Sequence, residues 1–269
     1  MSVTLTLHTQ PEVPLEAECL SPDRLATLDQ AGIAALPVLH GNRNMTVGDF
    51  FSVDGGKDLT VRIIGDLGRV KHVATGMSGG HLIIDGNIGS HLGLGMSGGE
   101  ITVTGHAGDW VGPEMGGGRI VVRGDAGHMV GSAYRGSKVG MRGGEIIVHG
   151  RIGNEAGNGM RRGMIAVAAD SGDFTGVNMI AGSIFVLGRL GARSGAGMKR
   201  GTIVSLHDAE VLPTYSYAAC YHPVFLRHYL LRLRQLGLPV EEAHLGGRYR
   251  RWSGDSVELN RGEILLFAG

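Results

Sequence analysis

Residues 76–94 read GMSGGHLIIDGNIGSHLGL, and residues 95–113 read GMSGGEITVTGHAGDWVGP. A third copy at residues 159–177, GMRRGMIAVAADSGDFTGV, keeps the pattern with substitutions at single glycine positions. Seven copies occur in all, and they are marked by Met77, Met96, Met115, Met141, Met160, Met179 and Met198. Neighbouring methionines are 19 residues apart, except for one step of 26. A fixed period of this length indicates a repeat architecture, in which each unit stacks on the next.

Two apolar columns run through the seven copies. The first consists of Leu82, Ile101, Ile120, Ile146, Ile165, Ile184 and Ile203. The second lies two residues further along and consists of Ile84, Val103, Val122, Val148, Val167, Val186 and Ser205. One residue separates the two columns in every copy, which is the period of a β-strand whose alternate side chains share a face. We therefore predict one short strand per repeat, with both columns facing a common core.

A Gly-x-x-Gly segment follows most of the strands, as at Gly86 and Gly89. Glycine tolerates the positive φ that tight corners require, so these segments mark the points where the backbone leaves the strand direction. Between the glycines runs a third small or apolar column, made of Ile88, Ala107, Ala126, Ile152, Ser171 and Leu190. Coils stacked in parallel place like residues above one another about every 4.8 Å. The sequence predicts an all-β fold, a right-handed parallel β-helix of 19-residue coils with short terminal α-helical segments.

The chain is expected to fall into three segments. These are an N-terminal strand and helix cap at residues 1–56, a β-helix of seven to eight coils at 57–206, and an amphipathic helix with a tail at 207–269. In the first segment, Ser21 is expected to cap a helix that begins at Pro22 and ends near Gly32. Phe50 and Phe51 are expected to close the first coil, because the open end of a β-helix is an unpaired edge.

After the last coil, an apolar series falls at helical spacing: Leu226, Tyr229, Leu230, Leu233 and Leu236. Two interpretations of this amphipathic helix are open. It covers the end or flank of the β-helix, or it docks onto another chain. The tail that follows carries arginines around Trp252 and finishes in an apolar strand, GEILLF.

The residue between the two inward columns should face outward, yet most members of this outer column are apolar. The outer column consists of Ile83, Thr102, Val121, Ile147, Ala166, Phe185 and Val204. A contiguous apolar strip on a surface indicates that something packs against it. Either the terminal segments of this chain or partner subunits are expected to cover it.

Composition excludes several classes of function. The formal net charge is zero, so there is no basic excess to drive binding to nucleic acid or to an anionic membrane. The two cysteines, Cys19 and Cys220, lie far apart in the sequence, which favours a reducing compartment. No apolar run reaches 18 residues and no signal peptide is recognisable, so a cytoplasmic location is expected.

Motifs that suggest chemistry are better explained by the repeat. Residues 93–98 match G-x-G-x-x-G, but dinucleotide binding needs that motif between a strand and a helix. Here the glycines instead recur in register at the bends between coils. The twelve histidines occupy different repeat columns, for instance at His81, His91 and His106, and are interpreted as scattered surface residues. We therefore predict neither a catalytic residue nor a metal site in this chain.

One repeat is longer than the others by seven residues, inserted around 132–138, and a loop there could reach a neighbouring chain. Next to it, the positions after the methionine become basic in later copies. Stacking would align these cations into a short stripe, suited to the carboxylates of a partner or to an anionic ligand, although a solvated face is the alternative. The candidate contacts for an anion or a partner are Tyr134, Arg135, Arg142, Arg161, Arg162, Lys199 and Arg200.

The GMSGG-x-I-x-V-x-G-x-x-G coil, followed by WSGD at 252–255 and GEIL at 262–265, resembles the C subunit of formylmethanofuran dehydrogenase. The resemblance covers nearly the whole chain. The coil is also similar to the C-terminal β-helix domain of glutamate synthase, but that domain belongs to a far larger polypeptide. Two kinds of complex contain such a C subunit. One is an archaeal molybdenum or tungsten dehydrogenase that reduces carbon dioxide to formylmethanofuran. The other is a bacterial formyltransferase/hydrolase that moves a formyl group from tetrahydromethanopterin to a methanofuran analogue and hydrolyses it to formate.

The resemblance implies a β-helical, non-catalytic scaffold between an amidohydrolase-like A subunit, the B subunit and a formyltransferase D subunit. It implies no cofactor bound by this chain alone, and the methanofuran analogue and tetrahydromethanopterin are used by the complex. Arginine outnumbers lysine 21 to 4, which favours the bacterial complex. The alternatives are the archaeal dehydrogenase and a stand-alone β-helix enzyme that acts on an anionic polymer.

Overall fold

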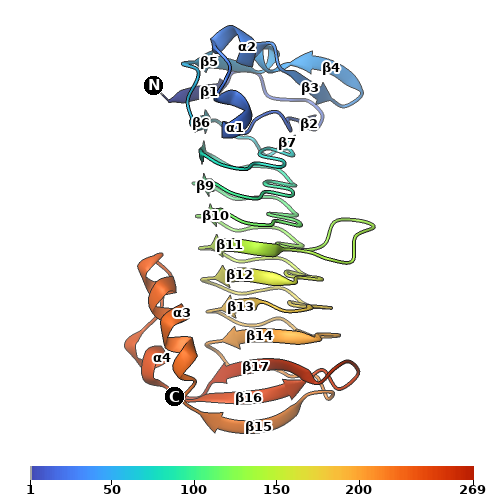
Figure 1. Ribbon diagram of the computed structural model, residues 1–269, viewed down its shortest axis with the longest axis vertical. Helices are drawn as coiled ribbons and strands as arrows, with labels where there is room; N and C mark the ends of the chain where they lie inside the picture. Colours follow the sequence, from blue (N-terminus) through green and yellow to red (C-terminus); the bar gives the residue numbers. More distant parts are fainter. Residues whose placement is uncertain (1) are drawn as a thin grey trace.

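The computed structural model describes residues 2–269 as one elongated stack (Figure 1). Its main feature is a thirteen-stranded sheet in the order β15-β16-β17-β14-β13-β12-β11-β10-β9-β8-β6-β1-β5. From β1 to β17 the neighbours in this sheet are parallel. The parallel series after β1 comprises β6 (Thr60–Ile64), β8 (His81–Asp85), β9 (Glu100–Val103), β10 (Arg119–Val122), β11 (Arg142–Val148), β12 (Arg162–Val167), β13 (Ser183–Val186), β14 (Arg200–Ser205) and β17 (Arg261–Phe267). The fold is therefore mostly β, with a large and mostly parallel sheet.

Equivalent residues of successive repeats lie opposite one another, as the columns predict. Leu82 pairs with Ile101, and Ile101 pairs with Ile120. A second ladder of parallel bridges links Leu67, Ile88, Ala107, Ala126, Ile152 and Ser171. The residues of the first two columns are all buried, and the bridged residues from Leu67 to Ser171 are buried as well. The periodic spacing therefore located the strands, the second ladder and the core correctly.

The repeating methionine and glycine have a shared packing reason. All seven methionines are fully buried. A Cβ added to Gly99 would lie 2.6 Å from Cε of Met77, and Gly118 stands in the same relation to Met96. Each methionine thus fills the space that a side chain on the next repeat would need, and the glycine also adopts a positive φ, +84° at Gly99.

The N-terminal end is closed by antiparallel strands. In the main sheet, β1 (Val3–Leu7) pairs in parallel with β6 and antiparallel with β5 (Phe51–Asp54). A four-stranded sheet lies beside it and contains β4 (Arg43–Thr46), β3 (Pro37–His40), β2 (Leu15–Glu16) and β7 (Val70–Lys71), with a 3-10 turn η1 (Val47–Asp49) after β4. Phe50 and Phe51 are buried in the core, so the expectation that they close the first repeat is confirmed.

The predicted single helix from Pro22 to about Gly32 is wrong. The segment forms two short helices, α1 (Pro22–Leu25) and α2 (Gln30–Ala34). Asp29 separates them, because its side chain accepts the N–H of Gly32 at 2.8 Å and so starts a new helix. Proline does occupy the first position of α1, but the side chain of Ser21 makes no capping hydrogen bond.

The parallel ladder continues one strand past residue 206. β17 pairs with β14 and places Ile264 and Leu266 on the two inward columns. β16 (Tyr249–Gly254) and β15 (Ser216–Tyr221) then close this end in antiparallel pairing. The two ends of the stack are therefore closed in the same way, by strands whose direction is reversed.

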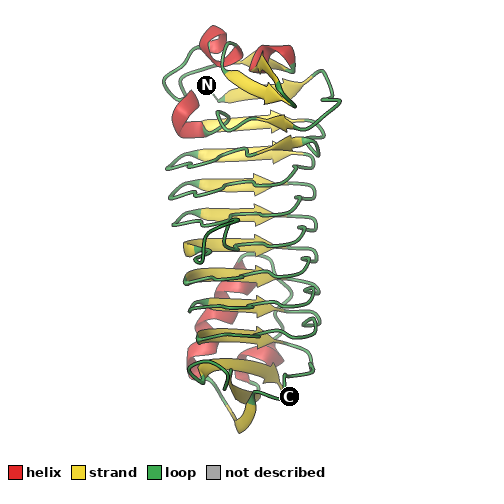
Figure 2. Ribbon diagram, turned by 90° about the vertical axis from the view of Figure 1, so that its right-hand side faces the viewer, coloured by secondary structure: helices red, strands yellow, loops and turns green. Residues whose placement is uncertain are grey.

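The predicted amphipathic helix is α3 (Val224–Gln235), and a short α4 (Glu242–Gly246) follows it. Figures 1 and 2 show both helices beside the C-terminal strands of the stack. Leu226, Leu230 and Leu233 are buried in one cluster with Phe185 and Val204 of the sheet. The interpretation that the helix covers a flank of the stack is confirmed.

Candidate functional site

The inserted segment forms a loop at residues 132–140 that projects from the stack beside β11 (Figure 1). Glu114 holds both of its ends. One carboxylate oxygen accepts the N–H of Tyr134 at 3.2 Å, and the other lies 3.9 Å from the guanidinium of Arg142. The backbone N–H of Gly140 donates to the carbonyl of Gly159 at 2.8 Å. The base of the loop is thus fastened to the repeats on either side.

The loop packs on a stack of rings. The rings of His72 and His91 are parallel with centroids 4.5 Å apart, and Trp110 continues the stack at 5.2 Å from His91. Tyr134 meets His91 edge-on at 5.4 Å, and the guanidinium carbon of Arg135 lies 5.8 Å from the Trp110 ring centroid. Tyr134 and Arg135 are therefore engaged with their own chain, at distances typical of aromatic and cation–π contacts.

The interpretation of the histidines as scattered is wrong for this pair. His72 and His91 are 19 residues apart and occupy one repeat column, which the spacing alone could have shown. Burial, together with the neighbouring His72 and Lys71, lowers the pKa of His91 to about 4. Its ring is therefore neutral at physiological pH, which allows it to stack between two other rings.

The basic residues do not form one continuous stripe. Arg142 and Arg162 are partners in the β11–β12 ladder, and Arg200 is the partner of Arg261 in the β14–β17 ladder. Ile180 and its neighbour Ala181 occupy the intervening repeat, so the cations fall into two groups.

One member of each group has an acidic partner: Arg142 lies 3.9 Å from Glu114, and Lys199 lies 4.0 Å from Glu258. The other members, Arg161, Arg162 and Arg200, are exposed. Within residues 2–269 the side chains of these three arginines make no ion pair or hydrogen bond. They are consequently available to carboxylates or other anions from outside the chain.

A hollow of about 400 Å³ connects the loop with the second basic group. Its lining includes Ser137, Lys138, Asn158, Asn178, Lys199 and Glu258. Two lysines, two asparagines and one glutamate therefore line it, and the Asn158 amide already donates to Glu155 at 3.0 Å. The arrangement can donate hydrogen bonds to an anionic or carbonyl-bearing group, and it joins the inserted loop to Lys199, which the sequence alone did not place together.

The outer column is covered over only part of its length. Val121, Ile147, Ala166, Phe185 and Val204 are buried, and they cluster with α3 and α4. Earlier in the stack, Ile83 and Thr102 remain partly exposed. The expectation that a terminal segment covers part of this column is confirmed.

The positions that flank the outer column change character where α3 begins to cover it. On one side they run His81, Glu100, Arg119, Glu145, Met164, Ser183 and Thr202. The charged members form a cross-strand ladder at the edge of the helix. Glu145 accepts hydrogen bonds from Arg119 at 3.0 Å and from Arg232 of α3 at 2.8 and 3.0 Å. On the other side of the outer column the positions run Asp85, Thr104, Arg123, His149, Ala168, Leu187 and Leu206. This change from polar to apolar was present in the sequence and could have located the helix.

Glu145 is the electrostatic anchor of α3. Burial alone would raise the pKa of this carboxyl, but the hydrogen bonds from Arg232 and Arg119 outweigh burial and hold the pKa below its usual value. The same bonds raise the pKa of Arg232. The pair therefore stays ionised at neutral pH and fastens the far end of the helix to β11.

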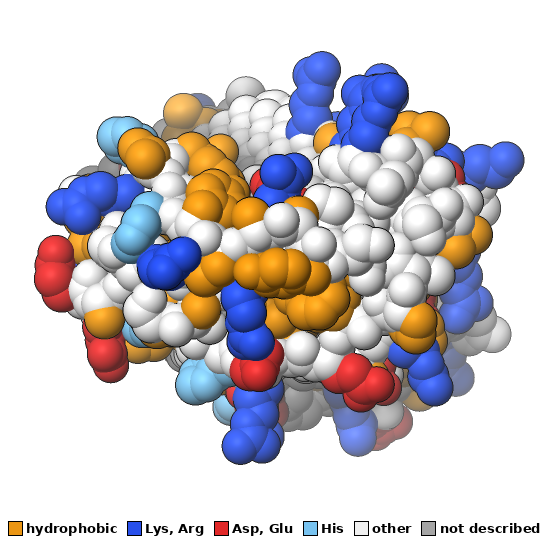
Figure 3. All heavy atoms as spheres, turned by 90° about the horizontal axis from the view of Figure 1, so that it is seen from below, with side chains coloured by type: hydrophobic (Ala, Val, Ile, Leu, Met, Phe, Trp, Pro, Cys, Tyr) orange, Lys and Arg blue, Asp and Glu red, His pale blue; other side chains and the backbone are white. Residues whose placement is uncertain are grey.

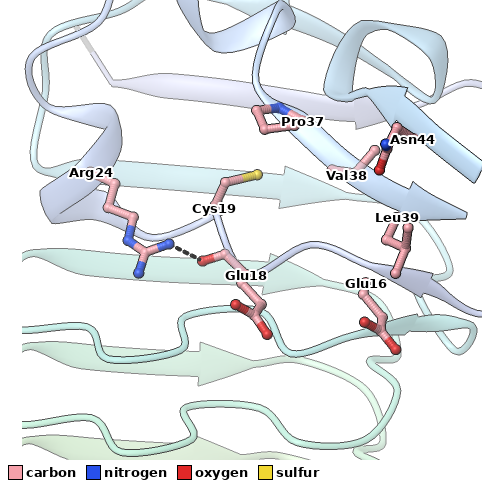
Figure 4. Close-up of a pocket in the computed structure, with 8 residues that line it drawn as sticks. All are labelled: Glu16, Glu18, Cys19, Arg24, Pro37, Val38, Leu39 and Asn44. Carbon is pink, nitrogen blue, oxygen red and sulfur yellow. Dashed lines mark hydrogen bonds between the residues drawn. The ribbon is translucent and has the colours of Figure 1, made fainter.

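A second hollow, of about 420 Å³, lies in the N-terminal part of the chain (Figure 4). Figure 4 shows the carboxylates of Glu16 and Glu18 directed away from the sulfur of Cys19, while Arg24 donates to the carbonyl of Glu18 at 3.0 Å. Burial raises the pKa of the Cys19 thiol to about 11. The thiol therefore stays protonated, which makes it a poor nucleophile.

Metal-ligating clusters and membrane spans are both absent from the described residues. Across 2–269, no group of three or more His, Cys, Asp or Glu side chains is placed to hold a metal ion. Over the same residues, no helix has the length and apolar character needed to cross a bilayer.

Comparisons with known proteins fall into two groups. No family model matches the chain. Over 91 residues the chain is 42% identical to the C subunit of molybdenum-containing formylmethanofuran dehydrogenase 1 from Methanothermobacter marburgensis, a match to 33% of this chain and 23% of that protein. The C subunit of tungsten-containing formylmethanofuran dehydrogenase 2 from Methanothermobacter thermautotrophicus is 41% identical over 91 residues, with 32% and 34% covered. The chain thus spans about a quarter to a third of the length of these relatives.

A solved structure matches the chain over its full length. It is a chain of the formyltransferase/hydrolase complex FhcABCD from Methylorubrum extorquens, crystallised with methylofuran. The two chains are 34% identical and superpose with a TM-score of 0.92, which covers 99% of this chain and 100% of the other.

Proposed function

Because this chain belongs to the family of the formylmethanofuran dehydrogenase C subunit, we propose that it is a structural, non-catalytic scaffold subunit of a formyltransferase/hydrolase complex. This complex would transfer a formyl group from formyl-tetrahydromethanopterin to a methanofuran analogue and hydrolyse the product to formate. Its other components would be an amidohydrolase-like A subunit, the B subunit and a formyltransferase D subunit. The full-length match to a chain of the FhcABCD complex carries the proposal.

The proposed scaffold is a right-handed parallel β-helix. The constant register of the strands and the second ladder of parallel bridges support a coil that closes on itself once per repeat. The right-handed sense rests on the strong preference of parallel crossover connections for that hand. Such a coil satisfies most backbone hydrogen bonds internally and fills its axis with side chains, which suits a rigid support for catalytic chains.

A molybdenum or tungsten formylmethanofuran dehydrogenase remains the second candidate, since the curated relatives carry that name. The extent of each match favours the hydrolase. The dehydrogenase subunits match a third of this chain, whereas the hydrolase chain matches 99% of it. The mass of the partner subunits distinguishes the two, because a dehydrogenase would bring a metal-pterin subunit.

The central experiment is affinity purification of the tagged chain from its native host, with identification of partners by mass spectrometry. We expect three co-purifying subunits and release of formate from formyl-tetrahydromethanopterin by the complex. The isolated chain should release none. Turnover by the isolated chain, on this substrate or on an anionic polymer, would refute the scaffold role.

The exposed arginines are proposed as contacts with carboxylates of a partner or of an anionic ligand. Arg161 and Arg200 carry this role because their guanidinium groups make no ion pair within residues 2–269. The double variant Arg161→Glu and Arg200→Glu should lower the yield of complex or its affinity for the methanofuran analogue. Arg189→Glu is a matched control, an exposed arginine on a turn of the stack. Equal yield and affinity in both variants would remove the arginines from this role.

A further inference from the structure

One side of α3 is covered by the segment that follows it. Arg234 donates to the carbonyl of Val240 at 2.8 Å and to the carboxylate of Glu242 in α4 at 3.1 Å. A Cβ added to Gly237 would lie 3.5 Å from the ring of His149, the residue directly after β11. This side of the helix therefore lies toward the ends of the strands, where the chain itself protects it.

The opposite side of α3 carries two aromatic rings that stay partly in solvent. Phe225, Tyr229 and Arg232 are four and three residues apart, so they form one stripe of the helix. Arg232 bonds to Glu145, which flanks the outer column on the side of the strand starts. The stripe therefore lies toward the strand starts. Phe225 and Tyr229 are 43% and 39% exposed there, although Tyr229 also touches the ring of Phe185 at 5.3 Å.

A row of arginines lies on the same face of the sheet, at the starts of three strands. Arg162, Arg200 and Arg261 are the first residues of β12, β14 and β17, and we call them the arginine row. Each stands two residues before a position that flanks the outer column, so its side chain lies on the face that α3 covers. All three are exposed, and within residues 2–269 their guanidinium groups make no ion pair or hydrogen bond. Figure 3 views the molecule from its C-terminal end and shows arginine and lysine side chains projecting around the margin.

The charges of the arginine row are not compensated as other charges on this face are. Arg119 lies between two glutamates of the neighbouring strands, at 3.0 and 3.5 Å. Arg200 and Arg261, by contrast, are direct cross-strand partners, and like charges in that position destabilise a sheet. Glu263, which follows Arg261 by two residues, is already bonded to Arg251 at 2.8 Å. The chain is neutral overall, so the row does not reflect a general basic excess. An uncompensated cluster of this kind indicates an anionic partner.

The space beside α3 has the dimensions of a second helix. Packed helices lie about 8–10 Å apart, axis to axis, and a strand advances about 3.3 Å per residue. A helix alongside α3 would therefore stand about three residues nearer to the strand starts. That places it over the strip between the arginine row and the flanking positions Ser183 and Thr202, which are only half-buried.

The spacing of the row along the stack also matches a helix. Neighbouring strands are about 4.8 Å apart, and one helical turn rises about 5.4 Å. Arg261 and Arg200 are on adjacent strands, whereas Ala181 occupies the equivalent position between Arg200 and Arg162. Acidic side chains one turn and then three turns from the first would consequently face the three guanidinium groups.

We infer that an amphipathic helix of another subunit lies alongside α3, with its apolar face on Phe225 and Tyr229 and its acidic side chains on the arginine row. This inference rests on the scaffold function proposed above, and it adds the surface and the chemistry of one partner. The occupant is a helix because α3 already packs on this face and because the row has the spacing of helical turns. Its side chains are acidic because the chain leaves three adjacent cations unpaired.

Crosslinking within the purified complex tests the contact. Arg162→Lys and Arg261→Lys each place an ammonium group in the row, and a carbodiimide joins an ammonium group to a carboxylate only where the two touch. The acids joined to the two new lysines should lie ten or eleven residues apart in one partner chain, because three strand spacings of about 4.8 Å equal about ten helical residues. Arg189→Lys, on an exposed turn of the stack, is the matched control and should give no link to that helix.

Charge reversal measures how much the contact contributes. Arg162→Glu combined with Arg261→Glu should lower the recovery of partner subunits at physiological salt by about tenfold or more. Phe225→Asp should lower it as well. These side chains are exposed, so the isolated variants should melt as the wild type does. Arg227→Glu, at an exposed arginine on the Arg234 side of α3, is the matched control and should leave the recovery unchanged.

The outcomes separate this inference from the scaffold function. If the partners co-purify but the new lysines give no link, or link to acids that do not share one helix, the inference is wrong and the scaffold function stands. If no partner co-purifies with the wild-type chain, both are wrong. If the glutamate variants keep their partners and lose only affinity for the methanofuran analogue, the row binds a ligand, and the inference is again overturned.

Discussion

Replacing Ile147 by alanine measures how firmly α3 covers the outer column. The side chain is fully buried in the cluster that contains Leu230 and Leu233 of α3. Ile83 occupies the same column in an earlier repeat, where it stays partly exposed. The two positions share residue type, strand geometry and orientation, and they differ in whether a helix lies above them. The pair of variants therefore isolates the contribution of α3.

The size of the effect follows from the atoms removed. Each substitution deletes three carbons, and at about 0.8 kcal/mol per buried carbon the transfer contribution at Ile147 is about 2.4 kcal/mol. The cavity left beneath the helix adds to this, so we expect a loss of about 3 kcal/mol, within the range of about 2–5 kcal/mol typical of buried positions. At Ile83 we expect about 1 kcal/mol or less, because much of the side chain is already in water.

Urea titration followed by circular dichroism gives both values from the shift in midpoint at constant slope. The Ile147→Ala chain should also melt about 6–10 °C lower. Ile147→Val, which removes one carbon, should fall between wild type and alanine. Equal losses at Ile147 and Ile83, or a loss below about 1 kcal/mol at Ile147, would show that α3 does not cover the column in solution.

Three other predictions concern single side chains. Gly118→Ala should destabilise the chain by about 2 kcal/mol or more, measured by thermal denaturation, because φ is +85° and the new Cβ would lie 2.6 Å from Cε of Met96. In the folded chain the pKa of Glu145 lies below its ordinary value of 4.5. Its stabilising effect is therefore complete above pH 4.5 and is lost as the pH falls through the pKa of the folded state. Glu145→Gln should remove this part of the acid dependence of the urea midpoint. His91 has a folded pKa of about 4 against an ordinary 6.5, so stability should fall as the pH drops from 6.5 to 4, and His91→Phe should remove that slope.

Each of these has a control in the chain. Gly79→Ala should be nearly neutral, since its Cβ would meet nothing within 4 Å. If the urea midpoint of Glu145→Gln fell at acid pH as steeply as that of the wild type, the hydrogen bonds between Glu145 and α3 would contribute nothing to folding stability. Phe174 occupies the position equivalent to His91 with a φ of 59°, so phenylalanine fits the backbone there. A pH profile in His91→Phe identical to wild type would contradict the burial of the imidazole.

Most of the stack could be predicted because its contacts recur at one sequence separation. Leu82, Ile101 and Ile120 lie above one another since each repeat returns the chain to the same point. The helix α3 was also predictable from its apolar period. The division of the N-terminal helical segment into α1 and α2 at Asp29 was not predictable in this way. There a single carboxylate competes for a backbone N–H and divides the segment into two helices.

The candidate site shows the same division. The seven-residue insertion and the basic positions are visible in the sequence, and their exposure follows from the register. The packing of Tyr134 on His91, by contrast, joins an insertion to a repeat column 43 residues earlier. No period relates the two, so only packing could bring them together.

The sequence by itself determined the strand of each repeat, the inward columns and the packing of each methionine against the glycine of the next repeat. These contacts recur every 19 residues. Only the tertiary structure decided which part of the outer column α3 covers, where the inserted loop rests, and which strand ends the sheet. Arg232 reaches Glu145 across 87 residues. A contact of that kind has no repeating separation, and it is selected by the fit of two surfaces rather than by the spacing of residues along the chain.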